Sequence, residues 1–565
     1  MENSNNIKKT ETAKENMTET ENNMVGIPDE QSEAMIQTKK ESPQQPTSSK
    51  LTIEEKRTKE KEQEANAEMN QSKRPLKEMI KDIFTNINTY FIVALAASMI
   101  AFSIDLISFQ VLPMKYIVMI ILAFLALLAG LIWVLFSKRI AKINRILTNV
   151  LITVITVILC VGCWYFQQAN QAIDHITIEA GDKEYEVISV VVTKDNPAEE
   201  LKDVAEGTFA IPEKIDEEHT KLTLEDIEKQ LKHSVKTKSY VSINEEATAL
   251  LDEETDAMIL NEAYRSLLDE DHPKFDTETK VIYTFKIEKE VKKIGSQVDV
   301  NRDPYNIYIS GIDTYGPIAT KSRSDVNMIA TINPQTHEIL LTSIPRDYYV
   351  AQTCQGNQYD KLTHTGIFGV DCTVESIENF LGISINYYGR VNFSSLENIV
   401  DAIGGIDVYN EIGFYSGVDG ELIPAGYLHM YGSTALKFAR ERHAYADGDR
   451  QRGRNQMIVL EAILDQAMSP AIITGYSGIM DAMSENFQTN MTKAEMTSII
   501  RRQIDEGGDW TITQQSVNGA GSTEWCPANG TYSYVMIPDD ATVSAAIQKI
   551  QAVMKVNDNQ QNSDK

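Results

Sequence analysis

Several catalytic signatures are absent from this 565-residue chain. It contains no Ser nucleophile elbow, no Walker phosphate-binding loop and no His-Asp-Ser order, which argues against serine hydrolases and P-loop NTPases. Positive charge is scarce as well, because the net charge is -28 and the sequence pI is about 4.8. An acidic chain is a poor general binder of nucleic acid, so any phosphate binding must come from local groups of arginine residues.

Large apolar and aromatic residues are nearly absent from residues 1–80, which are rich in Glu, Lys, Gln, Asn, Ser and Thr. Such a segment buries too little apolar surface to offset the entropy that it would lose on folding. We therefore predict a disordered arm at 1–80 and a short disordered tail at 556–565. No short apolar core with a cleavage site begins the chain, so a secretory signal is not predicted.

Three long apolar segments follow within residues 81–168. They are Ile83–Ile104, Tyr116–Ser137 and Leu147–Phe166. Each has about 20 residues, the length at which a helix crosses the hydrocarbon core of a bilayer. Three such segments in succession favour transmembrane helices over the buried helices of a soluble protein.

Positive charges gather on one side of these segments. They precede the first segment and fill the loop between the second and the third: Lys73, Arg74, Lys77, Lys81, Lys138, Arg139, Lys142 and Arg145. Loops rich in lysine and arginine stay in the cytoplasm. We therefore predict a multi-pass membrane protein with a cytoplasmic arm, in which everything after residue 168 lies outside the cell.

The chain has only five cysteines. Cys160 and Cys163 fall inside the third apolar segment and are interpreted as small apolar residues. The other three lie on the outer side, where disulfides persist, and Cys354 and Cys372 are the predicted pair because they close a short loop. Cys526 is then left over. Neither a CxxC pattern nor a histidine partner is identified for the outer cysteines, so a zinc site is not predicted.

The first outer region, residues 169–300, has a mixed pattern that predicts an accessory α/β domain. Two strands and two helices are expected, in chain order Tyr185–Val192, Leu224–His233, Thr255–Leu268 and Val281–Ile287, where the first and last are the strands. Thr223 and Thr255 are the predicted helix caps. No constellation of catalytic residue types stands out, so the role of this domain is not predicted.

The second outer region, residues 301–555, alternates strands and helices around one hairpin. The predicted strands are 306–311, 327–332, 338–343, 385–393, 406–409 and 533–537. The predicted helices are 374–381, 395–403, 432–439, 450–468 and 542–554. This order predicts an α/β sandwich around a central mixed sheet.

Charged residues surround the predicted hairpin of strands 327–332 and 338–343. Arg323 and Asp325 are two positions apart, so both side chains point to one face if the chain is extended there. A guanidinium and a carboxylate directed together suit a phosphate that carries a divalent metal, because arginine binds oxygens bidentately and aspartate binds the cation. A solvated structural salt bridge is the alternative. Asp313 and Arg346 lie before and after this pair.

A second group of arginines lies within residues 438–456: Arg440, Arg442, Arg450, Arg452 and Arg454. Asp449 precedes a predicted helix and can cap it. Asp449, Arg452 and Gln456 then share one helix face, at a helix N-terminus that favours anions. A simple basic surface is the alternative, but the two arginine groups together favour a phosphate site. Lys361, in a loop rich in Gly, Thr and His, could pair with a phosphate or merely with Asp360.

These residue types indicate phosphoryl chemistry carried out by positioning and charge. Only hard oxygen ligands are available for a metal, so Mg²⁺ is the expected cofactor and Mn²⁺ is possible.

The motifs GID, SRSD, INP, SIPRD, DKL, VNF, IVDAIGGIDV, ALKFARER and GDRQRGRNQ together resemble the LytR-CpsA-Psr family. The resemblance covers roughly Tyr305–Met468, and the predicted membrane topology agrees with it. It implies transfer of a glycopolymer from an undecaprenyl-diphosphate carrier to peptidoglycan in a Gram-positive cell envelope. The polymer would be wall teichoic acid, capsule or another secondary polysaccharide.

The resemblance also implies roles for individual residues. Asp313 and Asp325 match the aspartates that hold Mg²⁺ on the diphosphate. The matched diphosphate-binding residues are Arg323, Arg346, Arg440, Arg442, Arg452 and Gln456. The residues expected to act in catalysis are Arg323, Arg346, Lys361 and Asp449. Asn455 stands where the family often has arginine, which is a departure from its pattern.

Two other functions remain open from the sequence. With water as acceptor, the same site would make the protein a polyprenyl-diphosphate pyrophosphatase. A non-enzymatic envelope sensor or transcriptional attenuator is the other possibility, although the arm has no DNA-binding motif and no nucleic-acid partner is expected. The residue that takes the proton from the acceptor hydroxyl is open between Asp325 and Asp449, and a bound metal that lowers the pKa of the hydroxyl is a third alternative.

Overall fold

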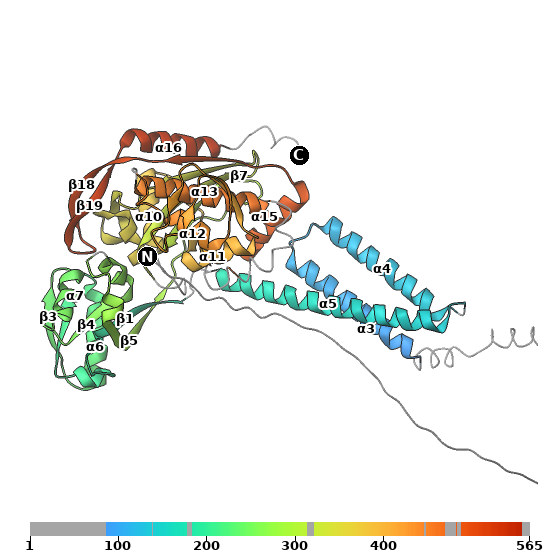
Figure 1. Cartoon of the computed structure of the whole chain (residues 1–565), viewed down its shortest axis with the longest axis horizontal. Helices are drawn as coiled ribbons and strands as arrows, with labels where there is room; N and C mark the ends of the chain where they lie inside the picture. The colour runs from blue at the N-terminus through green and yellow to red at the C-terminus, as the bar shows by residue number, and fades with distance from the viewer. Residues whose placement is uncertain are drawn as a thin grey trace, which may run out of the picture. The chain divides into compact units, whose positions relative to one another are not determined.

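The computed structural model describes residues 86–137, 139–177, 183–269, 271–312, 321–445, 448–468, 482 and 487–555 (Figure 1). The predicted arm, the predicted tail and Asp313 lie outside the described residues.

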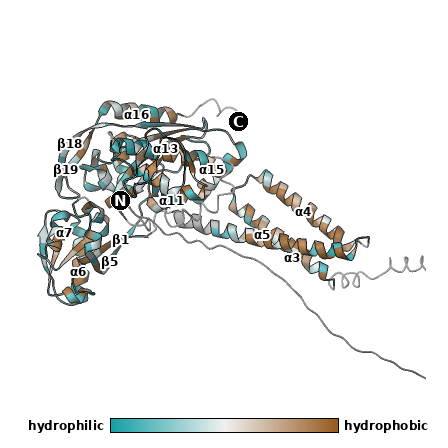
Figure 2. Ribbon diagram, viewed as in Figure 1, coloured by the Kyte–Doolittle hydropathy of each residue, from teal (hydrophilic) through white to brown (hydrophobic). Residues whose placement is uncertain are grey.

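Three long helices open the described part of the chain: α3 (Ile87–Phe109), α4 (Met114–Phe136) and α5 (Lys142–Ile176). Each contains a span long and apolar enough to cross a membrane, and the spans overlap the three predicted segments. The ribbons of these helices are mostly hydrophobic (Figure 2), and at most 22% of any span is buried inside the protein, which suits contact with lipid. A three-helix membrane anchor fits these helices, while the cytoplasmic placement of the arm stays a prediction.

The accessory domain is built on a five-stranded sheet with strand order β3-β2-β4-β1-β5. Its strands are β1 (Lys183–Thr193), β2 (Thr208–Pro212), β3 (Lys236–Tyr240), β4 (Ala257–Asn261) and β5 (Thr279–Glu290). Its helices are η1 (Leu201–Val204), α6 (Glu217–Leu231), α7 (Ile243–Leu251), η2 (Glu262–Leu268) and α8 (Phe275–Glu278). Both faces of the sheet are covered, because Val190 and Ile259 pack with Ile227 of α6, whereas Met258 and Leu260 pack with Leu250 of α7.

The helix predicted over Thr255–Leu268 is wrong in its first half. Residues 257–261 form the central strand β4, which is buried at all five positions, and only the following 262–268 segment is helical. A short apolar run that is buried on both faces cannot be distinguished from a buried helix by periodicity alone. The predicted caps are also wrong: Thr223 lies inside α6, which begins at Glu217, and Thr255 precedes a strand.

The second domain contains a six-stranded mixed sheet in the order β16-β11-β6-β7-β8-β17, as predicted for its fold class. Its strands are β6 (Tyr305–Ile312), β7 (Ser324–Asn333), β8 (Glu338–Ile344), β11 (Tyr387–Val391), β16 (Phe487–Thr489) and β17 (Thr511–Ser516). The central β6-β7-β8 strands are antiparallel, and β11 and β17 join them in parallel. The predicted hairpin is therefore confirmed as β7 and β8.

Helices cover both faces of this sheet: α10 (Val370–Leu381), α11 (Phe393–Ala402), α12 (Gly432–Arg440), α13 (Asp449–Met468), α15 (Lys493–Glu506) and α16 (Asp540–Val553). Side chains alternate along β7, so Met328 and Ala330 pack with Met457 of α13. Ile329 faces the other side, where it packs with Ile377 of α10 and Val543 of α16. This arrangement is the predicted α/β sandwich.

Shorter elements decorate the sandwich. They are β9 (Tyr349–Gln352), η3 (Thr353–Gln355), β10 (Gln358–Lys361), η4 (Leu362–His364), α9 (Thr365–Phe368), β12 (Ile406–Asn410), β13 (Phe414–Tyr415), β14 (Leu422–Ile423), β15 (Gly426–Met430), β18 (Gly519–Cys526) and β19 (Thr531–Pro538). A disulfide joins Cys354 and Cys372, the pair expected from the sequence, with 5.3 Å between their Cα atoms. The bond ties η3 to α10, and Cys526 is a buried free thiol.

Candidate active site

The β7–β8 hairpin brings the first two charged groups together. The strands are antiparallel with Asn327 opposite Ile344, so the start of β7 lies beside the end of β8. Asp325 and Arg346 occupy these two ends, and Arg346 Nη1 lies 2.7 Å from Asp325 Oδ2. The meeting of the SRSD and SIPRD motifs thus follows from strand pairing.

Arg346 lies at the centre of a group of carboxylates. Besides Asp325, its Nε atom is 3.6 Å from Asp449 Oδ2 and 3.8 Å from Asp347 Oδ2. Burial would lower the pKa of Arg346, but these three carboxylates raise it above its usual value. Arg346 is therefore a fixed positive charge, and its buried Nε–H group has no hydrogen-bond acceptor among the described residues.

Asp325 is a buried carboxylate that stays ionised. Burial would raise its pKa, but the positive charges of Arg346, Arg323 and Arg452 outweigh burial and lower it. Its Oδ1 atom also accepts a hydrogen bond of 3.0 Å from Thr363 Oγ1. A carboxylate held in this way is a weak base and a good anionic ligand, so the geometry favours a binding role for Asp325 over proton abstraction.

Asp449 is the first residue of α13, and two further arginines lie close to its carboxylate. Its Oδ1 atom lies 3.4 Å from Arg452 Nη2, one helical turn later, and 3.8 Å from Arg442 Nη1. Within the described part of the chain, this buried oxygen has no hydrogen-bond partner. The carboxylate therefore offers an oxygen that a ligand group can use.

A cavity of about 70 Å³ joins these elements. Five predicted residues line it, namely Asp325, Arg346, Asp449, Arg452 and Gln456, together with Asp347, Arg450, Gly453 and Arg454. Asp449, Arg452 and Gln456 were expected to share one face of a helix, and all three line the cavity. Its lining of arginines and carboxylates suits a phosphate group together with a cation.

The other predicted site residues that the structure describes do not line this cavity. Lys361 Nζ is 3.7 Å from Asp347 Oδ1. Arg323 Nη2 is 3.3 Å from Asp269 Oδ2 of the accessory domain, and the Arg440 guanidinium lies 3.9 Å from the centre of the Phe393 ring. Arg442 reaches the site only through Asp449. Asp313 cannot be placed, because it lies outside the described residues.

Sequence reasoning missed two contributors. Thr363 follows Lys361 by two positions and holds Asp325, but a threonine in a loop carries no signal of this. Gly453 lines the cavity where a Cβ atom would lie 3.2 Å from Ser343 Oγ, so α13 approaches β8 closely there.

Asn455, the departure from the family pattern, is buried and donates a hydrogen bond of 3.0 Å to the Phe438 carbonyl oxygen. Its role is therefore structural, and Arg454 lines the cavity beside it.

This chain is similar in sequence to several known proteins. Residues 274–550 match the model of the LytR_cpsA_psr family. A polyisoprenyl-teichoic acid–peptidoglycan teichoic acid transferase, TagU, of Bacillus anthracis is 36% identical over 213 residues, which cover 38% of this chain and 68% of the relative. A protein of the same name from Enterococcus faecalis is 35% identical over 207 residues, which cover 36% and 67%.

Solved structures are also similar. TagV of Bacillus subtilis is 28% identical with a TM-score of 0.39, covering 45% of this chain and 99% of TagV. TagT bound to LIIa-WTA is 25% identical with a TM-score of 0.38, covering 46% and 94%. On the family model and the identity to the TagU proteins, the chain belongs to the LytR-CpsA-Psr family.

Proposed function

We propose that this protein is an Mg²⁺-dependent phosphotransferase that attaches a glycopolymer from a polyprenyl-diphosphate carrier to peptidoglycan. The observation that carries the proposal is the convergence of Arg346, Arg452, Asp325 and Asp449 on one cavity. The names of its TagU relatives support teichoic acid as the polymer, with capsule or another secondary polysaccharide as the alternative.

The carboxylates present fit a divalent cation. Asp325, Asp347 and Asp449 supply hard oxygen donors of the kind that Mg²⁺ prefers, and the buried Oδ1 atom of Asp449 lacks a hydrogen-bond partner among the described residues. Asp325 would hold the ion, and Asp313 is its proposed second ligand. When bound, Mg²⁺ would offset the negative charge of the diphosphate.

The residues of the chain have distinct tasks in the proposed reaction. A hydroxyl group of peptidoglycan attacks the sugar-linked phosphorus, and undecaprenyl phosphate leaves. Arg346 and Arg452 bind the phosphate oxygens and stabilise the charge that develops on them. Asp325 holds Arg346 in place through their 2.7 Å ion pair. Asp449 is the better candidate for accepting the hydroxyl proton, because its Oδ1 atom has no hydrogen bond within the described structure, whereas both oxygens of Asp325 are engaged.

The proposed location is the membrane of a Gram-positive cell, with the N-terminal arm in the cytoplasm and the sandwich domain outside. The lysines and arginines beside the membrane spans support this orientation. The Cys354–Cys372 disulfide supports it independently, because disulfides persist in oxidising surroundings outside the cytoplasm.

The full chain in detergent, a polyprenyl-diphosphate-linked sugar and peptidoglycan fragments provide the test. We expect sugar phosphate to become linked to the glycan, and EDTA to abolish the linkage until Mg²⁺ is restored. Release of free sugar phosphate without coupling would instead make the protein a pyrophosphatase. Tight lipid binding without turnover would contradict the transferase and favour an envelope sensor.

Replacing Arg442 with alanine should have a small effect in the same assay. Its side chain is 41% exposed and its nitrogen is 3.8 Å from Asp449, and exposed ion pairs contribute only about 0–1 kcal/mol. This corresponds to a decrease in the transfer rate of at most about fivefold. A much larger decrease, measured at saturating lipid substrate, would show that Arg442 binds the phosphate directly.

A further inference from the structure

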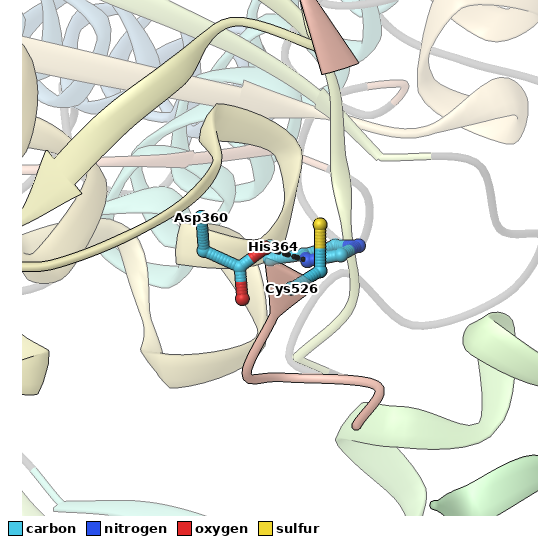
Figure 3. Close-up of side chains that lie close together, drawn as sticks. All are labelled: Asp360, His364 and Cys526. Atoms are coloured by element: carbon cyan, nitrogen blue, oxygen red, sulfur yellow. Dashed lines mark hydrogen bonds and ion pairs between the residues drawn. The ribbon is translucent and has the colours of Figure 1, made fainter. Parts of the chain in front are cut away.

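Three chemically distinct side chains come together outside the cavity described above. Asp360 lies on β10, His364 on η4, and Cys526 at the end of β18 (Figure 3). One potential ligand atom from each of them lies within 4.8 Å of the others. All three residues are almost completely buried, with exposed fractions of 2%, 2% and 0%. A carboxylate, an imidazole and a thiol are thus enclosed together.

We propose that Asp360, His364 and Cys526 form a structural zinc site. Sulfur, nitrogen and oxygen donors together are typical of Zn²⁺, whereas Mg²⁺ accepts oxygen donors almost exclusively. Structural zinc sites have every coordination position filled by protein donors, and the burial of these three residues leaves little access for water to take one of them. Asp360 can supply one carboxylate oxygen or both, so the three residues can offer up to four donor atoms.

The existing hydrogen bonds are compatible with the ion. Asp360 Oδ1 lies 2.7 Å from His364 Nδ1, and its two oxygens also accept hydrogen bonds from the backbone N–H groups of Lys361 and Ala528. Bond lengths of about 2.0–2.1 Å place two tetrahedral zinc ligands roughly 3.3 Å apart. The carboxylate and imidazole would therefore move apart slightly, and the thiol would move inward, while the backbone N–H groups hold the carboxylate.

Such an ion would hold in place two segments that contact residues of the active site. Lys361 and Thr363 lie between the two ligands Asp360 and His364, and these intervening side chains approach Asp347 and Asp325. Cys526 belongs to β18, whose partner β19 carries Met536, a residue that lines the cavity and donates its backbone N–H to the Asp347 carbonyl oxygen. Zinc would therefore fasten the 360–364 turn to the β18–β19 hairpin and limit the movement of both.

The test uses the full chain in detergent with Cys160→Ser and Cys163→Ser, which replace the two other free thiols. Because Cys354 and Cys372 form a disulfide, Cys526 is then the only thiol in the chain. We expect about one zinc ion per chain after growth with zinc, measured by elemental analysis. Exchange with Co²⁺ should give a thiolate-to-cobalt charge-transfer absorption in the near ultraviolet. Cobalt bound by oxygen ligands at the phosphate site would not give this absorption.

Adding Cys526→Ser to this variant should remove the absorption and reduce the zinc content at least tenfold, and His364→Gln should do the same. Zinc should also raise the melting temperature of the parent variant and leave that of the Cys526→Ser variant unchanged. The proposal is overturned if the parent variant holds no zinc and shows no cobalt–thiolate band. It is equally overturned if Cys526→Ser retains the metal. If Cys526→Ser fails to fold, the zinc content and cobalt spectrum of the parent variant decide the matter alone.

Discussion

Replacing Arg346 with lysine is expected to reduce the rate of glycopolymer transfer by a factor of about 10²–10³, the loss seen when one preorganised donor to a developing charge is removed. Lysine keeps the positive charge but replaces the planar guanidinium with a single ammonium group. It cannot contact Asp325 and also present a second N–H donor in a fixed plane to the phosphate, as the guanidinium of Arg346 can. The coupling assay with carrier-linked sugar and peptidoglycan fragments measures the effect.

Arg450→Lys is the matched control for this substitution. Arg450 also lines the cavity, but its contact within the described structure is a hydrogen bond of 3.3 Å to the Gly519 carbonyl oxygen. The ammonium group of lysine can donate the same hydrogen bond. We expect this variant to keep its rate within a few-fold of the parent protein. Equal losses in the two variants would mean that the cavity needs only positive charge, and would contradict a specific role for the Arg346 guanidinium.

The second large effect is expected from Asp325→Asn. The substitution keeps the size of the side chain and an acceptor for Thr363, but it removes the buried negative charge that pairs with Arg346. Removing one partner of a buried ion pair costs about 3–5 kcal/mol. We therefore expect a marked decrease in the free energy of unfolding of the sandwich domain, together with loss of transfer activity that added Mg²⁺ does not restore.

The pH dependence of stability separates this charge from simple packing. The folded-state pKa of Asp325 is lowered, so its ionised form stabilises the folded protein above the unfolded-state pKa of about 3.9. That contribution is lost as the pH falls from this value through the lower folded-state pKa. In thermal unfolding between about pH 5 and pH 2, the melting temperature of Asp325→Asn should therefore fall less than that of the parent protein. Asp360, whose pKa is also lowered, keeps part of the dependence in both. Parallel curves would contradict this account.

The parts of the site that were predictable are those in which local sequence determines geometry. A three-residue spacing on a helix places Asp449 and Arg452 together at the cavity, because helix periodicity is fixed. The two-residue spacing of Arg323 and Asp325 does not bring both side chains there, since Asp325 lines the cavity and Arg323 pairs with Asp269. The Asp325–Arg346 pair then follows from the hairpin, whose antiparallel register needs only the short connection between β7 and β8.

Other features depend on tertiary contacts that no local pattern encodes. Strand β4 is as apolar as a buried helix, and only its place at the centre of the accessory sheet makes it a strand. The ion pair between Arg323 and Asp269 joins two domains, so the SRSD motif alone could not reveal it. Cys526 was predicted to lack a partner, and neither Asp360 nor His364 could be connected with it, because β18 reaches them only in the folded chain.

The charged lining of the cavity has a consequence for the products of the proposed reaction. In that reaction, the arginines and carboxylates that line the cavity bind the phosphate junction and not the repeat units of the polymer. A catalyst that recognises only this junction has no means of counting repeat units, so short and long chains would be attached with equal preference. The length distribution on the wall would then copy that of the carrier-linked pool, which gel electrophoresis of both can compare. Control of chain length would belong to the polymerase that acts earlier.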